Sequence, residues 1–273
     1  MRVGFVQWPD GLNPKSDVWF GLVADVARAA PDVLITNEMP FGPWVAASPH
    51  FDSKRAQESV QIHEDGLEAL RALNVPLVIS SQPAIASDRL VNEAFVLERG
   101  SFRFLHQKHF FPAEDGWFET GWFTTSRPGF ELVEAAGLRI GALICTELMF
   151  NERARAYGRA GAHLIAVPRA TGQSVAEWKT AGAMAAIVSG CYMVSSNRLG
   201  SSSGGPTFGG GAAMLLLRMD HCFVIRTTGI RLPSSLSINN ERWSRKGTIP
   251  FMSRSARLRQ SRVQNPDQDL IVS

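Results

Sequence analysis

Short apolar runs alternate with helical stripes of apolar residues along the first 200 positions of the chain. The run at 2–6 is typical of a buried strand, and in the helix predicted after it Trp19, Leu22 and Val26 fall on one face. Ser16 is positioned to cap this helix and Pro31 to end it. The pattern therefore predicts a strand followed by an amphipathic helix.

The same alternation continues through the rest of the chain. Further helices are predicted at 54–73, 151–160 and 174–189, and the last of them begins with a capping box of Ser174 and Glu177. Further strands are predicted at 33–35, 77–80, 91–98, 102–105, 138–144, 164–167, 192–195, 212–217 and 223–227. Strands that alternate with helices predict an α/β fold with its sheet buried under helices.

Composition indicates one folded domain. The 273 residues are 45% hydrophobic and 19% charged, which excludes disorder as the main state. No linker divides the first 200 residues, so we assign a single domain to 1–250. The net charge of +3 is concentrated after position 217, where 10 Arg and Lys stand against 4 Asp and Glu. We expect 251–273 to form a basic arm on a surface or a partner.

Neither disulfides nor export signals are indicated. Cys145, Cys191 and Cys222 are too few and too scattered for a disulfide framework or a zinc cluster, which fits a reducing compartment. The N-terminal segment lacks the pattern of a signal peptide, and no apolar run approaches the roughly 18 residues of a membrane span. We therefore expect a cytoplasmic protein that does not engage a membrane.

Three reactive residues each follow the end of an apolar strand: Glu38, Lys108 and Cys145. In α/β sheets, ligands and side chains from different strands meet beyond the carboxyl ends of those strands. A cysteine attacks only as the thiolate. A nearby ammonium stabilises the thiolate, and a carboxylate can generate it by taking the thiol proton. This set predicts that Cys145 is a nucleophile with a depressed or carboxylate-coupled pKa, and that the other two thiols are inert.

The segments around these residues carry a family resemblance. Glu38 stands in LITNEMPFG, Lys108 in FLHQKHFFP, Glu119 in GWFETGWF and Cys145 in GALICTELMFNE, with Asn92 on a strand between the first two. In this order and spacing the blocks resemble the nitrilase, or carbon-nitrogen hydrolase, superfamily. The likeness extends to about residue 250 through VSSNRLG, the turn at 208–210 and the lysine and proline of 246–250. The resemblance implies a four-layer α-β-β-α sandwich and a hydrolase without metal or organic cofactor.

The resemblance also implies the role of each residue. Glu38 is the expected general base and Cys145 the nucleophile, while Lys108 and the backbone N–H of Thr146 stabilise the oxyanion. Such fixed donors act on charge that develops in the transition state. Glu119 is expected to hold Lys108 or the substrate.

Two points remain open at this level. Glu114 lies six residues after the lysine and competes with Glu119 for the place of the second glutamate. Nitrilases of the superfamily commonly have a tryptophan after the cysteine, where this chain has Thr146. We therefore favour a small carboxamide or N-carbamoyl substrate over a nitrile, and we expect a homodimer or a higher homo-oligomer.

Aromatic and cationic residues near these blocks are candidates for substrate contact. Phe41 and Trp117 belong to a group of loop aromatics that indicates a substrate with an apolar part. Arg169 follows another strand, where it can bind a carboxylate or a carbonyl. Its alternative role is a structural ion pair with Glu147 or Glu152.

Three other functions have weaker support from the sequence. The stretch 200–204 satisfies the G-x-S-x-G pattern of serine hydrolases, but glycines follow it instead of a helix. His109 could act as the base of a Cys-His hydrolase, although on a strand it faces away from Lys108. The basic arm suggests nucleic acid, yet it lacks interleaved aromatics, so we expect no nucleic-acid partner.

Overall fold

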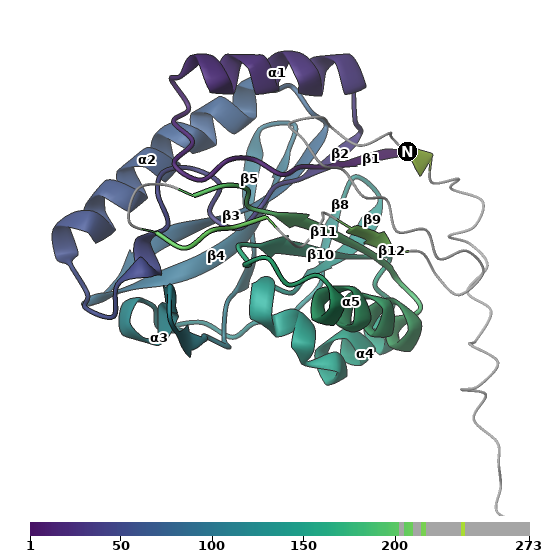
Figure 1. The fold of residues 1–273 in the computed structure, drawn as a ribbon. Coiled ribbons are helices and arrows are strands. Elements are labelled where there is room, and N and C mark those ends of the chain that lie inside the picture. The colour runs from purple at the N-terminus through teal and green to yellow at the C-terminus, as the bar shows by residue number, and fades with distance from the viewer. Residues whose placement is uncertain (202–204, 210–213, 217–235, 238–273) are drawn as a thin grey trace, which may run out of the picture.

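Two β-sheets packed face to face form the centre of the molecule, and helices cover their outer faces (Figure 1). The computed structural model describes residues 1–201, 205–209, 214–216 and 236–237. The first sheet runs in the order β13 (Leu236–Ser237), β1 (Arg2–Phe5), β2 (Val33–Ile35), β3 (Leu77–Ala86), β4 (Arg89–Glu98), β5 (Ser101–Gln107). The second runs β12 (Met214–Leu216), β11 (Tyr192–Asn197), β10 (Leu164–Arg169), β9 (Leu138–Ala142), β8 (Val133–Ala135).

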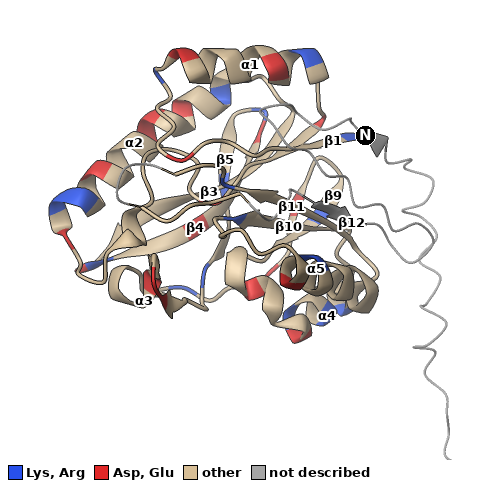
Figure 2. Ribbon diagram, viewed as in Figure 1, with Lys and Arg blue, Asp and Glu red and all other residues tan. Residues whose placement is uncertain are grey.

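The helices complete the four layers. Helices α1 (Asp17–Ala29) and α2 (Ser53–Ala72) cover the first sheet, and α4 (Asn151–Ala160) and α5 (Ala176–Ser189) cover the second (Figure 1). Acidic and basic residues are spread over α1 and α2 (Figure 2), as expected for helices with one face in water. The α-β-β-α architecture expected from the sequence is therefore confirmed.

The parallel direction of the central strands places their C-terminal ends at the same end of both sheets. Strands β1, β2 and β3 are parallel to one another, as are β9, β10 and β11. The backbone N–H of Glu38, beyond β2, donates to the carbonyl of Arg169 at the end of β10 over 3.1 Å, so the two sheets meet at these ends. The loops that carry reactive residues thus share one end of the sandwich.

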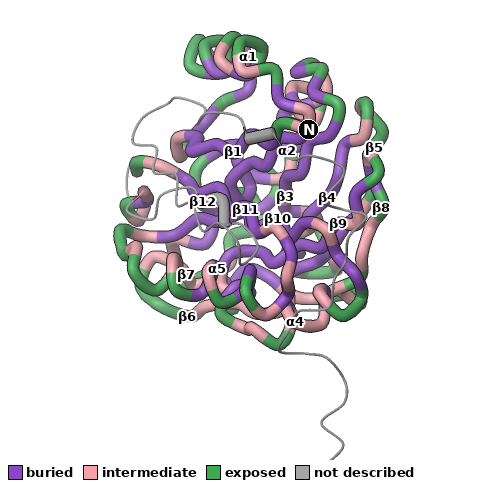
Figure 3. Tube along the Cα trace, turned by 90° about the vertical axis from the view of Figure 1, so that its right-hand side faces the viewer, coloured by how far each residue is buried: buried purple, intermediate pink, exposed green. Residues whose placement is uncertain are grey.

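The main core lies between the sheets. Figure 3 shows that the central strands of the molecule are buried, and the first sheet contributes Val3, Phe5, Val33, Ile35, Leu77 and Ile79 to this core. The second sheet contributes Ile140, Ala142, Leu164, Ala166 and Val194. Because Cys145 belongs to this same buried cluster, the core extends up to the reactive end of the second sheet.

Local sequence signals explain most element boundaries. The side chain of Ser16 accepts a hydrogen bond from the backbone of Trp19 and caps α1, as predicted. In contrast, α5 begins at Ala176, and its N-cap Val175 makes no side-chain hydrogen bond. The predicted capping box is wrong because the Ser174 hydroxyl contacts the carboxylate of Glu177 and not the helix backbone.

Several short elements were not predicted. They are β8, β13, the hairpin of β6 (Ala113–Glu114) and β7 (Trp117–Phe118), the helix α3 (Glu119–Trp122) and the 3-10 helix η1 (Val45–Ala47). A further short element, the 3-10 helix η2, spans Cys145–Met149. Each is too short to show a hydrophobic period. The predicted strand at 223–227 and the basic arm at 251–273 lie outside the described residues, so the assignment of one domain to 1–250 stays a prediction. Across the described part of the chain, no helix is both long and apolar enough to span a membrane.

A buried histidine makes the stability of this fold depend on pH. His63 of α2 hydrogen-bonds the carbonyl of Ser59 through Nδ1 (2.7 Å), and its Nε2 accepts the backbone N–H of Phe41 (3.3 Å). Burial lowers the pKa of His63 from 6.5 to about 4. Its contribution to stability is complete above pH 6.5 and is lost as the pH falls toward 4, because only the unfolded chain binds the proton.

We therefore expect the free energy of unfolding to drop by about 2 kcal/mol between pH 7 and pH 5 through this group. Urea unfolding at both pH values measures it. His63→Gln should flatten this part of the pH dependence, while the same change at the exposed His50 should leave it unaltered. Equal pH dependence in wild type and His63→Gln would show that another group is responsible.

Candidate active site

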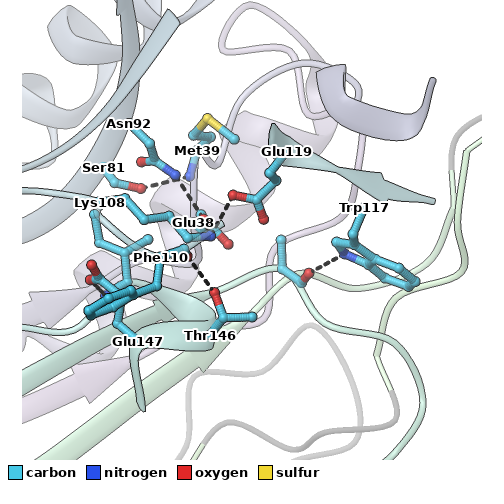
Figure 4. A network of polar contacts seen from close by, with 12 residues as sticks. Glu38, Met39, Ser81, Asn92, Lys108, Phe110, Trp117, Glu119, Thr146 and Glu147 are labelled. Carbon is cyan, nitrogen blue, oxygen red and sulfur yellow. Dashed lines mark hydrogen bonds and ion pairs between the residues drawn. The ribbon is translucent and has the colours of Figure 1, made fainter. Parts of the chain in front are cut away.

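Glu38, Lys108 and Glu119 form one buried charged cluster (Figure 4). The Nζ of Lys108 lies 2.9 Å from Oε1 of Glu38 and 2.6 Å from Oε2 of Glu119, and all three side chains have no exposed surface. Cys145 lies near enough that the charges of all three affect its pKa. The residues predicted to converge from separate strand ends are thus brought together.

Lys108 is held as a permanent cation. Burial alone would lower its pKa, but the carboxylates of Glu119 and Glu38 outweigh burial and raise the pKa above its usual value. Its backbone N–H donates to the carbonyl of Asn92, which fixes the start of the loop after β5 (2.9 Å). The lysine is therefore an ammonium with a fixed position.

One carboxylate oxygen of Glu38 accepts hydrogen bonds, and among the described residues the other has no donor. Oε1 accepts hydrogen bonds from Lys108 and from Nδ2 of Asn92 (2.8 Å), whereas Oε2 is buried and accepts none from the described residues. A buried acceptor without a donor is costly, so such an atom is expected to meet a proton or a ligand. Oε2 is available to take a proton.

Cys145 occupies a strained turn immediately after β9. Its φ of 53° lies in the left-handed region, which non-glycine residues seldom adopt, and the short 3-10 helix η2 begins with it. Burial raises the pKa of the thiol well above its ordinary value, the carboxylate of Glu38 adds to this, and Lys108 opposes it. Of the two alternatives expected for this thiol, a depressed pKa is therefore wrong, whereas coupling to a carboxylate agrees with the effect of Glu38. The raised pKa favours the neutral thiol over the thiolate.

Of the two candidate glutamates, Glu119 is the one that lies beside Lys108. It begins α3, is buried, and pairs with Lys108, while Glu114 lies exposed on β6. Burial raises the pKa of Glu119, the Lys108 ammonium opposes this shift, and Glu38 adds to it. Its Oε1 is buried without a partner among the described residues. This carboxylate is thus a second unused acceptor beside the ammonium.

Of the residues predicted to contact the substrate, Thr146 and Trp117 lie beside the charged cluster. Thr146 follows Cys145 and donates its hydroxyl to the carbonyl of Phe110 (2.9 Å). The indole N–H of Trp117 donates to the carbonyl of Ala170 (2.7 Å), and the backbone of Ala170 hydrogen-bonds the thiol. Both residues therefore border the cluster (Figure 4).

Phe41 lies elsewhere, and this expectation is corrected. Its ring packs against Trp8, Trp19 and His63 in the core between the first sheet and helices α1 and α2. Met39 has a φ of 42°, so the chain turns sharply after Glu38 and sends the following residues to the helix-covered side of the sheet. Phe41 follows Glu38 closely in sequence, but its ring packs in the core under the helices and not in the charged cluster.

Arg169 is fully buried at the end of β10. Its Nε donates to the hydroxyl of Ser195 (2.6 Å), and its guanidinium lies over the ring of Trp178 at 5.0 Å. Burial lowers the pKa of Arg169 to about 10, and an interaction with Cys145 opposes this. The side chain thus contributes positive charge on the thiol side of the site.

The histidine alternative loses support from this geometry. The ring of His109 stacks on His106, with ring centroids 5.7 Å apart, and also packs against Phe130. Its Nε2 is buried and makes no hydrogen bond with the described residues. The serine pattern falls partly on 202–204, outside the described residues, and Gly200 forms a bridge to Phe208.

Two residues near the site were not predicted. Arg198, in the VSSNRLG block, is buried and donates to the carbonyls of Gly42 (2.9 Å) and Glu38 (3.3 Å) while pairing with Asp10. His106 is buried and hydrogen-bonds Glu147 at 2.8 Å. The sequence offered only their position inside family-like blocks, because the burial of either side chain depends on tertiary packing. In the described part of the chain, no three His, Cys, Asp or Glu side chains are grouped to bind a metal.

Comparisons with known proteins identify the class and the family. A family described as carbon-nitrogen hydrolase matches residues 18–237. The class of protein is therefore a hydrolase with the fold of the nitrilase superfamily. The chain belongs to the carbon-nitrogen hydrolase family. A search of curated proteins gave no match.

Solved structures show the same fold at low sequence identity. The carbon-nitrogen hydrolase from Helicobacter pylori G27 is 20% identical with a TM-score of 0.75, over 89% of this chain and 91% of that chain. An amidase from Nesterenkonia sp. is 19% identical with a TM-score of 0.69, over 86% and 90%. A mutant of the amidase from Nesterenkonia sp. AN1, showing Michael addition of acrylamide at its active site cysteine, is 16% identical with a TM-score of 0.68, over 90% and 96%.

Proposed function

We propose that this chain hydrolyses small carboxamides through a thioester on Cys145. The observation that carries the proposal is the pair of unused, buried acceptors beside the Lys108 ammonium, Oε2 of Glu38 and Oε1 of Glu119. One of them can take the thiol proton and the other can accept an N–H of the substrate. An amide supplies such N–H groups, whereas a nitrile has none, and an unpaired buried acceptor opposes binding.

In the acylation step the thiol proton passes to Oε2 of Glu38, and the sulfur attacks the carbonyl carbon of the amide. The carbonyl electron pair moves to oxygen, where the Lys108 ammonium and the N–H of Thr146 stabilise it. Two of the three N–H bonds of Lys108 are used by Glu38 and Glu119, so one remains for this oxygen. Collapse breaks the C–N bond, and ammonia leaves with the proton from Glu38.

Deacylation repeats the same steps with water. Glu38 takes a proton from a water molecule, whose oxygen attacks the thioester carbon and displaces the sulfur. Cys145 then takes the proton back from Glu38 and is restored as a thiol. The balance is one amide and one water to one carboxylic acid and one ammonia, and splitting the reaction in two lowers each barrier.

Substrate contacts are assigned to three further side chains. Glu119 binds the amide N–H through Oε1, Trp117 offers an apolar ring surface because its own N–H is bonded to Ala170, and Arg169 contributes positive charge. A small amide as the substrate class is supported by similarity of fold to the amidase from Nesterenkonia sp. AN1, a mutant of which shows Michael addition of acrylamide at its active site cysteine.

A matched substrate panel tests this function. Each member pairs a carboxamide with the nitrile of the same acyl group, with an N-carbamoyl amino acid as a third arm, and mass spectrometry follows the products. We expect kcat/KM for the amide to exceed that for the matched nitrile at least tenfold. A tenfold preference for the nitrile would assign the chain to nitrile hydrolysis, and release of a free amino acid only from the third arm would assign it to N-carbamoyl substrates.

The two nearby glutamates provide a matched pair of variants. Glu119→Gln is expected to lower kcat/KM for amides about 10- to 100-fold, because hydrogen bonds to a charged partner contribute about 1.5–3 kcal/mol. Glu114→Gln, five positions earlier and exposed, should leave kcat/KM unchanged. Steady-state kinetics on one amide measures both. Equal kcat/KM values for the two variants would show that Glu119 does not contact the substrate.

A further inference from the structure

Glu147 forms a second buried polar cluster behind the proposed catalytic residues. Its side chain has no exposed surface, and Oε2 accepts the backbone N–H of Ile144 (2.7 Å) and the Nε2 of His106 (2.8 Å). Its other oxygen, Oε1, accepts the backbone N–H of His109 (2.8 Å). Three donors thus converge on one carboxylate, which lies beside Thr146 and Phe110 in Figure 4.

The partners of His106 define its tautomer. Its Nδ1 accepts the backbone N–H of Phe130 at 3.1 Å, so this nitrogen carries no proton in the neutral ring. The single ring proton is therefore on Nε2, which points at Glu147. His106 acts as a donor to the carboxylate and as an acceptor from the backbone, and a flipped ring would lose both bonds.

These contacts join the two halves of the site. His106 and His109 flank Lys108 at the end of β5 in the first sheet, while Ile144 and Glu147 flank Cys145 beyond β9 in the second sheet. The carboxylate binds N–H groups from both segments. We propose that Glu147 and His106 are positioning residues that set the Lys108 ammonium relative to the Cys145 sulfur, an inference that rests on the proposed function of those two residues.

The surroundings leave this arrangement little freedom. A Cβ added to Gly129 would lie 2.6 Å from both His106 Nδ1 and His109 Nε2, so the backbone of this glycine closes over the two rings. The turn at Cys145 is strained at a φ of 53°, and Glu147 closes it twice: its carboxylate accepts the N–H of Ile144 while its own N–H donates to the Ile144 carbonyl (3.2 Å). Rearranging the turn would leave a buried carboxylate without its donors.

Two substitutions of His106 separate positioning from simple packing. In His106→Gln the side-chain amide nitrogen reaches the place of Nε2 and still donates to Glu147. In His106→Asn the shorter amide reaches only the place of Nδ1, so the bond to Phe130 is kept and the bond to Glu147 is lost. We expect kcat of the glutamine variant within about threefold of wild type and kcat of the asparagine variant about 10²-fold lower, because a displacement of about 1 Å in a catalytic group has that effect.

The readouts are kcat and KM for one amide and the rate at which iodoacetamide alkylates Cys145, all on the folded full-length chain. For His106→Asn we expect the loss in kcat with KM within about twofold, and a changed alkylation rate that His106→Gln restores. Glu147→Gln should behave like His106→Asn, because an NH₂ group replaces one acceptor oxygen. Glu152→Gln, on the exposed face of α4, is the control and should match wild type.

Failure of the inference can be told apart from failure of the function. Equal kcat and equal alkylation rates for the two His106 variants would overturn the positioning role, as would a loss confined to KM or one that equals the loss of folded protein measured by circular dichroism. If wild type and Cys145→Ala released equal ammonia, the function itself would be wrong. The alkylation rates would then still decide whether this pair positions the thiol. If Glu147→Gln does not fold, the two His106 variants decide.

Discussion

Replacing Cys145 by alanine is expected to reduce amide turnover by a factor on the order of 10⁶, to the background rate, because loss of a nucleophile removes the covalent route altogether. The methyl group fits where the thiol was, since Cys145 is a buried member of the core and alanine is smaller. Ammonia release by the purified variant measures the effect, and circular dichroism verifies the fold. Cys145→Ser should be nearly as inactive, because a hydroxyl is far less acidic than a thiol.

A second buried thiol provides the matched control. Cys191 donates to the carbonyl of Ala162 (3.2 Å) in the core under α5, away from the charged cluster, so Cys191→Ser is expected to keep wild-type kcat. Brief iodoacetamide treatment should modify Cys145 ahead of Cys191, because Glu38 can take the proton of the first thiol. Retention of activity by Cys145→Ala, or modification of Cys191 first, would show that the nucleophile lies elsewhere.

The fold could be predicted where the hydrophobic period was long enough to be unambiguous. In α1, Trp19, Leu22 and Val26 recur at helical spacing, and all three are buried against the first sheet. The three residues of β8 and the two residues each of β6 and β7 give no period, and they form because neighbouring strands offer hydrogen-bond partners. Such elements follow from tertiary structure and not from local sequence.

Some residues of the candidate site could also be predicted from the sequence, and others depended on tertiary structure. That Glu38 and Lys108 lie together could be predicted, because each follows an apolar strand and strand ends of a layered α/β fold converge. The choice between Glu114 and Glu119 could not be predicted, since both follow the lysine in a short loop and only the hairpin of β6 and β7 decides which carboxylate turns inward.

Electrostatics were the least predictable part. A lysine near Cys145 suggested a depressed thiol pKa, yet burial and two carboxylates raise it, because their combined effect exceeds that of one ammonium. Burial of each group depends on packing from both sheets, which no local pattern encodes. The raised pKa favours the neutral thiol over a preformed thiolate, which is why the proposed mechanism assigns removal of its proton to Glu38.

Lys108→Ala is expected to lower kcat by about 10² to 10³, because a fixed ammonium aimed at the developing oxyanion contributes roughly 3 to 4 kcal/mol to the transition state. Both Glu38 and Glu119 would also lose their cation while buried, and breaking a buried ion pair costs about 3–5 kcal/mol of stability. Kinetics should therefore be measured well below the melting temperature of the variant. Lys54→Ala on the exposed face of α2 is the control and should change neither quantity.

Lys108→Arg should restore little of this activity, although it keeps the charge. A planar guanidinium cannot bond both carboxylates at 2.9 and 2.6 Å and also direct a third N–H at the substrate oxygen from the position of a compact ammonium. The raised pKa of Lys108 keeps its amine protonated, so borohydride should trap no substrate on it. A trapped adduct would show that Lys108 acts as a nucleophile. Near wild-type kcat in Lys108→Ala would mean that backbone donors alone stabilise the oxyanion, and Lys108 would then serve only to neutralise the buried carboxylates of Glu38 and Glu119.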